Sequence, residues 1–216
     1  GYQHTCAIEN NGKVWCWGSG EYGKLGIGST SNQLSPVAVD PTESYLEVSV
    51  GGYHTCGVRV DGTVWCWGRS SHYQLGQGDK VDHDLPVQVG AEASWEKVCG
   101  SYYHTCAIKQ DGALWCWGNG GYGEMGSGVA ATATTPQQVG TETDWDSLSC
   151  DRQSTCALKK DGTLWCWGQN TQGQLGLGHK QSGIKVPTQV GTDNDWERVV
   201  AGYEHTCVMK TDDSLH

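Results

Sequence analysis

The sequence predicts an all-β fold made of a repeated unit of about 50 residues. The tetrapeptide Trp-Cys-Trp-Gly occurs four times, always 50 residues apart, beginning at Trp15, Trp65, Trp115 and Trp165. A fixed period of this length is typical of stacked or radially arranged units, none of which buries a core alone. Glycine (32 residues) and tryptophan (11 residues) are frequent, and no segment keeps the apolar period of a helix. Short strands joined by tight turns are therefore expected throughout.

The charge balance excludes some classes of partner. The chain has 14 lysines and arginines against 24 aspartates and glutamates, a formal charge of −10. Such a surface repels phosphate backbones, so no nucleic-acid partner is expected. No apolar run approaches the ~18 residues of a membrane helix, so no membrane span is expected. The first residue, Gly1, already lies inside a repeat, so a missing signal peptide carries no information about location.

The first two strands of the unit are predicted on either side of a turn that contains Gly12. Apolar and polar residues alternate over 4–8 and again over 13–17. If Glu9 and Lys13 close the hairpin, Cys6 faces Cys16 in a non-hydrogen-bonded pair. The α-carbons of such a pair approach to ~4.5 Å, a distance that a disulfide tolerates. The hairpin therefore predicts a Cys6–Cys16 bridge.

The same count applies in the next three units, where Asp-Gly forms the turn. It predicts three more bridges, Cys56–Cys66, Cys106–Cys116 and Cys156–Cys166. The alternative is metal binding, but each hairpin supplies only two thiolates and no CxxC knuckle occurs. Four units have a histidine two residues before their first cysteine: His4, His54, His104 and His205. The fourth unit has Ser154 at this position. We therefore expect these histidines to form structural hydrogen bonds rather than a zinc site.

The predicted bridges indicate a cellular location. Each closes a loop of about 11 residues, for which the chain-entropy model gives roughly 3 kcal/mol of stabilisation. A reducing cytosol would not maintain such bridges. The sequence therefore predicts a secreted or cell-surface protein, in an extracellular or periplasmic space.

The tryptophans of each hairpin are predicted to pack between neighbouring units. Trp15 and Trp17 are two residues apart and so share one face of the hairpin. The residue predicted opposite the first tryptophan is small in every unit: Ala7, Gly57, Ala107 and Ala157. A large residue against a small one is how packed layers interdigitate. The alternatives are stacking on sugars and light absorption by clustered indoles.

Two further strands complete the unit. A glycine-rich turn and a variable loop lead to a proline and a short apolar strand, and a polar linker then leads to an aromatic residue: Tyr45, Trp95, Trp145 or Trp196. Four strands per unit are the pattern of a β-propeller blade. We expect one repeat domain over 1–216, with units at 1–47, 48–97, 98–147 and 148–198 and part of a fifth at 199–216.

These motifs resemble the regulator of chromosome condensation repeat family. The resemblance is carried by G-x-x-H-T-C-A-(I/L), by D-G-(T/A)-(V/L)-W-C-W-G and by the G-Q-N-x-x-G-Q-L-G-x-G turn at 168–178. It implies a β-propeller used for protein contacts, and its cysteine-bridged form is similar to secreted bacterial proteins. The family implies seven blades, about 350 residues at this unit length. We therefore expect these four units and part of a fifth to belong to a longer ring.

Three cysteines lie outside the four hairpin pairs. Cys99 and Cys150 occupy equivalent strands of successive units, one position apart, which puts them on opposite strand faces. Adjacent blades touch through opposite faces, so a bridge between blades is one interpretation and two free buried thiols are the other. Cys207 is expected to be unpaired, because its hairpin partner would follow His216.

Two sets of loop residues are candidate binding sites. The linkers between units are expected to share one rim and are acidic, with Glu142, Asp144, Asp193 and Asp195 among their carboxylates. They could attract a basic partner or hold divalent cations weakly, or they are ordinary solvated loops. The variable loops should lie on the other rim, where divergence on a uniform scaffold favours specific recognition. Their candidate residues are Asp82, His83, Asp84, His179 and Lys180.

No catalytic motif occurs in the sequence. A nucleophile elbow, a phosphate-binding loop and a zinc-protease helix motif are all missing, so neither enzymatic activity nor a cofactor is expected. We predict a non-catalytic extracellular scaffold for protein–protein interaction or surface structure. The alternatives are an inhibitor of a secreted enzyme, a fibre subunit that self-assembles through open ends, and a carbohydrate-binding module. The family also contains a nuclear exchange factor for the GTPase Ran, but the bridges and the negative charge argue against that role.

Overall fold

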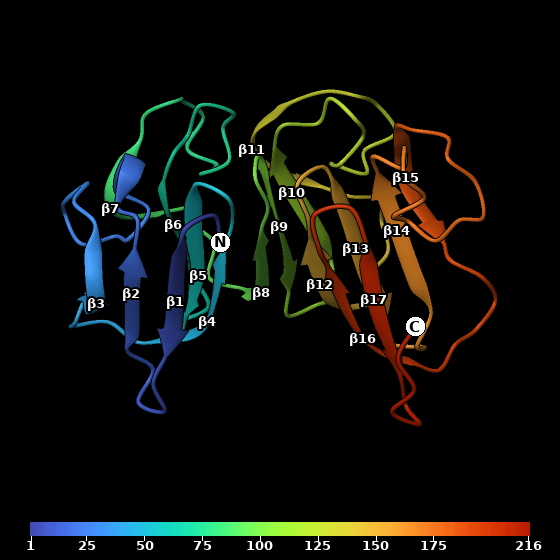
Figure 1. Cartoon of the computed structure of the whole chain (residues 1–216), viewed down its shortest axis with the longest axis horizontal. Coiled ribbons are helices and arrows are strands. Elements are labelled where there is room, and N and C mark those ends of the chain that lie inside the picture. The colour runs from blue at the N-terminus through green and yellow to red at the C-terminus, as the bar shows by residue number, and fades with distance from the viewer.

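The computed structural model describes all residues from 1 to 216 and contains five antiparallel sheets that follow one another along the chain (Figure 1). The first sheet has three strands and a short 3-10 helix: β1 (His4–Ile8), β2 (Val14–Gly18), η1 (Glu21–Gly23) and β3 (Gln33–Val39). The second sheet has four strands: β4 (Tyr45–Val50), β5 (His54–Arg59), β6 (Val64–Gly68) and β7 (His83–Gln88). The third consists of β8 (Trp95–Gly100), β9 (His104–Lys109), β10 (Leu114–Gly118) and β11 (Ala133–Gln138). The fourth consists of β12 (Trp145–Cys150), β13 (Ser154–Lys159), β14 (Leu164–Gly168) and β15 (Ile184–Gln189), and the fifth of β16 (Trp196–Ala201) and β17 (Thr206–Lys210).

Each sheet is a meander in which neighbours in sequence are neighbours in space. Strands β4, β8, β12 and β16 contact one another and lie toward the middle of the molecule, whereas β3 and β15 lie at its outer sides (Figure 1). This radial order of four-stranded sheets confirms the predicted all-β propeller fold. The sheets begin at Tyr45, Trp95, Trp145 and Trp196, three residues before the unit boundaries drawn from the sequence. The helix has three residues, and no helix is long and apolar enough to cross a membrane.

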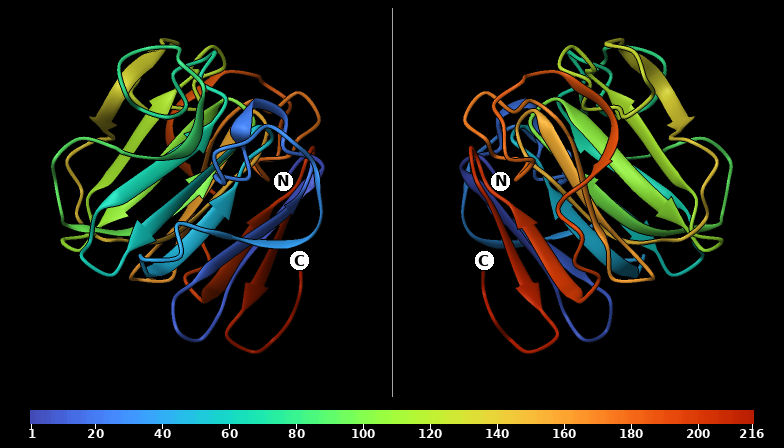
Figure 2. Two further views of the ribbon diagram at one scale, coloured as in Figure 1. Left: turned by 90° about the vertical axis from the view of Figure 1, so that its left-hand side faces the viewer. Right: turned by 90° about the vertical axis from the view of Figure 1, so that its right-hand side faces the viewer.

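The connections between strands alternate between two rims (Figures 1 and 2). The long loops after β2, β6, β10 and β14 gather on one rim, which we call the loop rim. The hairpin turns, such as residues 9–13, lie on the opposite rim, the hairpin rim. In a meander the inner turns at 51–53, 101–103 and 151–153 share the loop rim, and the linkers between sheets share the hairpin rim. The two sets of predicted binding residues therefore lie at opposite ends of the molecule.

The hairpins have the predicted register. The amide of Glu9 donates to the carbonyl of Lys13 at 2.9 Å, and Gly12 has the left-handed φ of +83° that this turn requires. Cys6 is the cross-strand partner of Cys16, and the structure contains all four hairpin bridges. The bridged α-carbons are 4.1 to 4.2 Å apart, slightly closer than the sequence argument assumed.

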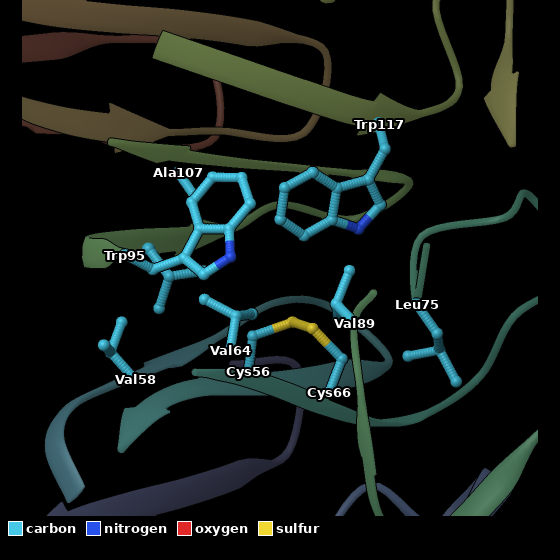
Figure 3. Close-up of a cluster of buried hydrophobic side chains, with 10 residues drawn as sticks. Cys56, Val58, Val64, Cys66, Leu75, Val89, Trp95, Ala107 and Trp117 are labelled. Atoms are coloured by element: carbon cyan, nitrogen blue, oxygen red, sulfur yellow. A yellow bond between two sulfur atoms is a disulfide. The ribbon is translucent and has the colours of Figure 1, made fainter. Parts of the chain in front are cut away.

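Successive blades stack with the disulfide face of one against the tryptophan face of the next. Figure 3 shows Trp95 and Trp117 of the third sheet over the Cys56–Cys66 bridge and Val64 of the second. The second tryptophan of the motif is fully buried wherever a blade precedes it, at Trp67, Trp117 and Trp167 (all 0% exposed). No tryptophan side chain is among the exposed large apolar residues. These indoles are therefore core residues of the blade junctions, as predicted.

A buried polar relay also joins three of the four pairs of neighbouring blades. His54 Nε2 lies 2.8 Å from Thr105 Oγ1 of the next blade, and Thr105 Oγ1 donates to the carbonyl of Gln74 at 2.8 Å. Because the threonine donates onward, the histidine must donate to it from Nε2. His4–Thr55 and His104–Thr155 repeat the arrangement. Burial lowers the pKa of His4, His54 and His104 to about 3, so these imidazoles are neutral and structural.

Cys99 and Cys150 form a fifth bridge, which joins β8 to β12 and so connects two blades, as the blade-to-blade interpretation predicts. Their α-carbons are 5.7 Å apart, within the normal range for a disulfide. Cys207 is unpaired and exposed.

Candidate functional site

Five tyrosines gather on the loop rim, around the axis on which the inner strands converge. They occupy two neighbouring positions of the repeat, just before the His-Thr-Cys strand, and we call them the axial cluster: Tyr2, Tyr53, Tyr102, Tyr103 and Tyr203. None of these tyrosines is among the binding residues predicted from the sequence. The recurrence of tyrosine at 2, 102 and 203 was the available signal.

Tyr102 is the centre of this cluster. Its ring centroid lies 6.0 Å from that of Tyr2 and 5.7 Å from that of Tyr53. It also lies 6.2 Å from Tyr203. The pairs with Tyr53 and Tyr203 are edge-on and the pair with Tyr2 is tilted, and such contacts stabilise aromatic clusters. The repeat position of Tyr102 is occupied by Gly52 in the preceding blade, where a Cβ would come within 2.7 Å of the Tyr102 ring. The glycine therefore makes room for the tyrosine that centres the cluster.

Cationic side chains lie over the faces of these rings. The guanidinium carbon of Arg69 is 5.3 Å from the ring centroid of Tyr53, and that of Arg152 is 5.1 Å from the ring of Tyr203. Arg152 Nη1 also donates to the Tyr203 hydroxyl at 2.5 Å. Within a chain of net charge −10, this rim therefore combines aromatic rings with positive charge.

The cluster borders a cleft of about 410 Å³ on the axis. Its walls include Tyr2, Tyr102 and Tyr203, together with Cys150 and Arg152. Glycines of the inner turns form much of the remaining lining. The cleft therefore exposes backbone as well as aromatic and charged groups to a ligand.

Asp151 is the acidic group of this cleft. Burial, with a smaller contribution from the nearby Glu204 carboxylate, raises the pKa of its carboxyl to about 7, although the Arg152 amide and guanidinium oppose the shift. Other repeats have Gly51 or Ser101 at this position, where the Ser101 hydroxyl lies 2.7 Å from His104 Nδ1. The fourth repeat has Asp151 at this position, and it has Ser154 where the third repeat has His104.

The candidate residues from the variable loops lie elsewhere on the loop rim. Asp82 Oδ1 accepts a hydrogen bond from the Ser70 amide at 2.7 Å, so one oxygen of this carboxylate stabilises the loop between β6 and β7. His83 begins β7 and is half-buried, and Asp84 is exposed. The His179 carbonyl accepts from Asn170 Nδ2 at 2.8 Å, and Lys180 is exposed. Asp82 and Asp84 border one shallow groove together with Glu21 and Tyr22. A ligand role for these five residues remains a prediction.

On the hairpin rim, the acidic linkers are not the one-signed surface that the sequence suggested. Lys159 pairs with Asp144 at 3.2 Å, and Lys210 pairs with Asp193 at 2.6 Å and with Asp195 at 3.0 Å. The lysines come from the second strand of the following sheet, which linker composition alone does not reveal. Glu142 is exposed and has no ion pair.

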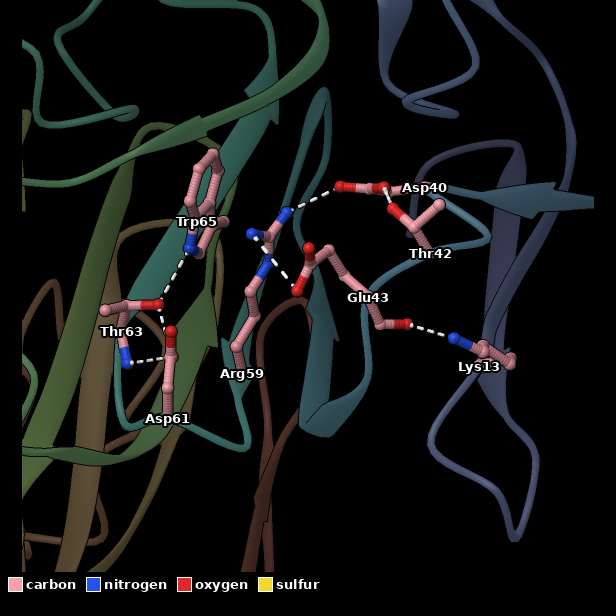
Figure 4. A network of polar contacts seen from close by, with 8 residues as sticks. All are labelled: Lys13, Asp40, Thr42, Glu43, Arg59, Asp61, Thr63 and Trp65. Atoms are coloured by element: carbon pink, nitrogen blue, oxygen red, sulfur yellow. Dashed lines mark hydrogen bonds and ion pairs between the residues drawn. The ribbon is translucent and has the colours of Figure 1, made fainter.

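These pairs belong to a repeated clamp. Figure 4 shows its first copy, in which Arg59 lies over Trp65 and reaches Asp40 and Glu43. The guanidinium carbon is 3.6 Å from the Trp65 ring centroid, and Nη2 is 2.6 Å from Asp40 Oδ2. Lys109, Lys159 and Lys210 occupy the same position in later blades. The linker carboxylates thus pair with a cation of the sheet that follows them.

One group of potential metal ligands is explained by the disulfides. The donor atoms of His104, Cys106 and Cys150 lie within 4.8 Å of one another. Both sulfurs are already bonded to other cysteines, and the His104 ring nitrogens lie within hydrogen-bond distance of Ser101 and Thr155. In this state the group is therefore structural.

The fold and the repeat together define a β-propeller of the regulator of chromosome condensation type. The regulator of chromosome condensation (RCC1) repeat matches residues 11–58, 61–108, 111–158 and 161–209, and a second form of the repeat matches 46–74, 95–124 and 146–174. Because these matches cover most of the chain, the protein belongs to the RCC1 repeat family.

Solved structures share the fold. Human WBSCR16 superimposes with a TM-score of 0.87 at 22% identity, over 96% of this chain and 56% of that protein. Prp20p from Saccharomyces cerevisiae superimposes with a TM-score of 0.84 at 20% identity, over 99% and 55%. The ultraviolet-B receptor UVR8 of Arabidopsis thaliana is 36% identical over 53 residues, 24% of this chain and 12% of the receptor. The chain thus spans about half of the two solved structures, and at these identities they show the fold alone.

Proposed function

We propose that this protein is a non-catalytic extracellular scaffold that binds a protein partner through the axial cluster and its cleft. The observation that carries the proposal is the gathering of Tyr2, Tyr102 and Tyr203 with Arg152 at one surface. Tyrosine and arginine are enriched among the residues that dominate the energy of protein interfaces. Tyrosine supplies a large contact area at little cost in side-chain entropy.

The rings are held in place before any partner binds. Tyr102 packs among its neighbours, and Arg152 donates to Tyr203. A surface ordered in advance loses less conformational entropy on association. The cleft between the rings offers a recess for one anchoring side chain of the partner.

Five disulfides support an extracellular location, because such bridges persist in oxidising compartments. Protein binding is compatible with what is known of one neighbour, since Prp20p binds Gsp1p and histones. Catalysis has no support in the sequence, which lacks a recognisable nucleophile or phosphate-binding motif. Among the alternatives, sugar binding through exposed tryptophans has less support, since the tryptophan side chains are buried or half-buried.

The test compares two exposed tyrosines, one inside the axial cluster and one outside it. Tyr203 is 50% exposed in the cluster, and Tyr122 is 40% exposed on an outer loop. The immobilised chain is used to capture partners from the extracellular proteins of its source, and each captured protein is titrated against purified variants. We expect Tyr203→Ala to weaken binding by about tenfold or more, and Tyr122→Ala to weaken it less than about twofold.

The proposal fails if Tyr203→Ala binds as tightly as the parent chain. It also fails if Asp84→Ala or Lys180→Ala, in the predicted variable-loop set, causes the larger loss. Tyr102→Ala is a less suitable probe because that ring supports its neighbours. Thermal unfolding of each variant separates loss of binding from loss of fold.

A further inference from the structure

The disulfide that joins two blades lies at the wall of the axial cleft. Cys150 is half-buried and lines the cleft, whereas its partner Cys99 is 6% exposed. The hairpin bridges are better shielded, because seven of their eight cysteines are 0% exposed: Cys16, Cys56, Cys66, Cys106, Cys116, Cys156 and Cys166. The eighth, Cys6, is half-buried but does not line the cleft. One bridge of the five therefore combines a link between blades with access from a cavity.

We propose that Cys150 is a thiol-exchange site, at which a small thiol entering the axial cleft forms a reversible mixed disulfide. The thiolate of the ligand attacks Cys150 Sγ, the Cys99–Cys150 bond breaks, and Cys99 leaves as a thiolate. A new bond then joins the ligand sulfur to Cys150 Sγ. No electrons are gained or lost overall, because one disulfide is exchanged for another.

Access decides which of the two sulfurs is attacked. A thiol in the cleft meets Cys150 first, since Cys99 is buried behind it. Attack at Cys150 makes Cys99 the leaving group. The displaced Cys99 stays opposite Cys106, its cross-strand partner in the β8–β9 pair. It therefore remains positioned to attack the mixed disulfide and restore the bridge.

Electrostatics in the cleft favour the reacting form of the thiol. Arg152 lines the same cleft two residues after Cys150, and a nearby cation stabilises thiolate over thiol. The chain as a whole has a negative net charge, whereas the Arg152 guanidinium places a positive charge at this cleft. Asp151 opposes it when ionised, and burial raises the pKa of that carboxyl to about 7. The ligand expected here is therefore a compact monothiol that enters as its anion.

The first experiment measures the two sulfurs separately, in a Cys207→Ser background that removes the exposed free thiol. Cys99→Ala leaves Cys150 as the one free thiol, and Cys150→Ala leaves Cys99. Both variants keep the four hairpin bridges. The rate of reaction with 5,5′-dithiobis(2-nitrobenzoate) is followed under native conditions. We expect Cys150 to react at least about tenfold faster than Cys99, and equal rates would overturn the proposal.

The second experiment uses the intact bridge, with glutathione as the probe. The Cys207→Ser chain is incubated with reduced glutathione and quenched with acid, and free thiols are alkylated after unfolding. Peptide mass spectrometry then reports glutathione on Cys150 and the alkyl group on Cys99. Glutathione on Cys99, or opening of the Cys56–Cys66 bridge at a comparable rate, would refute the assignment.

A further variant tests the role of the cation. Arg152→Ala in the Cys99→Ala background should slow the reaction of Cys150 by about threefold or more, because the thiolate loses its nearby positive charge. Arg69→Ala, which removes a cation that does not line the cleft, should leave the rate unchanged. Equal slowing by both variants would show that Arg152 has no specific part in the exchange.

Discussion

Replacing Ala113 with threonine should stabilise the third blade. In the second blade, Trp65 Nε1 donates to Thr63 Oγ1 at 2.8 Å, and that hydroxyl donates to Asp61 Oδ1 at 2.6 Å. The fourth blade repeats both bonds at 2.9 and 2.7 Å. The third blade has Ala113 at this position, and the buried Trp115 Nε1 has no hydrogen-bond partner.

The rest of the site is already in place. The Ala113 amide donates to Asp111 Oδ1 at 2.9 Å, as the Thr63 amide does to Asp61 at 3.0 Å. A buried N–H without a partner costs about 1–3 kcal/mol, and a hydrogen bond to a carboxylate contributes about 1.5–3 kcal/mol. Burial of the hydroxyl and the loss of side-chain freedom offset part of this gain. We therefore expect a net stabilisation of about 1–2 kcal/mol.

The assay is urea unfolding of the parent chain, Ala113→Thr and Ala113→Val. Valine has nearly the shape of threonine without the hydroxyl, so it reports the effect of added bulk. The threonine variant should also unfold about 2–8 °C higher, given about 2–4 °C per kcal/mol for a chain of this size. Thr63→Ala should lose a similar free energy. The reasoning is refuted if Ala113→Thr is no more stable than Ala113→Val.

Three further predictions concern protonation and bridging. The free energy of unfolding should fall as the pH drops below 6.5, because the unfolded state binds protons that His54 and His104, with pKa values of about 3, cannot take up. Buried carboxyl groups that are protonated only in the folded state act in the opposite direction between pH 4 and 7. The loss of unfolding free energy should therefore be steepest between pH 4.5 and 3. An unfolding free energy, measured in urea, that does not change over this range would contradict the lowered histidine pKa values. Glu124→Gln should raise the free energy of unfolding by on the order of 3 kcal/mol at most above pH 7, and by little below pH 4.5. Burial raises the pKa of Glu124 to about 7, so the parent chain buries a charged carboxylate only at the higher pH. An equal effect at both pH values would exclude this cause. The double variant Cys99→Ala, Cys150→Ala opens a loop of 51 residues and should lower the free energy of unfolding by about 4 kcal/mol. Removal of one hairpin bridge should lower it by about 3 kcal/mol. A larger loss for the hairpin bridge, measured by urea unfolding, would count against the loop-entropy explanation.

The features that the sequence predicted well are local. The bridge between Cys6 and Cys16 follows from the register of one hairpin, which a short turn fixes. The packing of Trp117 between blades follows from its recurrence at a fixed period and from the small residue Ala107 opposite its neighbour Trp115. The bridge joins residues ten positions apart, and the tryptophan recurs every 50 residues, so both features can be read from the sequence pattern.

The features that were missed depend on the radial arrangement of the blades. Tyr2, Tyr102 and Tyr203 meet because the inner turns converge on one axis, and no pair of them is close in sequence. The carboxylate of Asp144 is neutralised by Lys159, which lies in the following sheet. Linker composition alone therefore does not show that some of these carboxylates are paired with lysines. Contacts of this kind require the angle between successive blades, which hydrophobic periodicity does not encode.

The most direct test of the account is a count of free thiols in the unreduced chain. The protein, purified from an oxidising compartment, is unfolded without reductant, alkylated and weighed intact by mass spectrometry. The sequence has 11 cysteines and the structure pairs ten of them in five bridges, so one alkyl group is predicted, on Cys207. Eleven alkyl groups would contradict the bridged extracellular scaffold and restore the intracellular alternative.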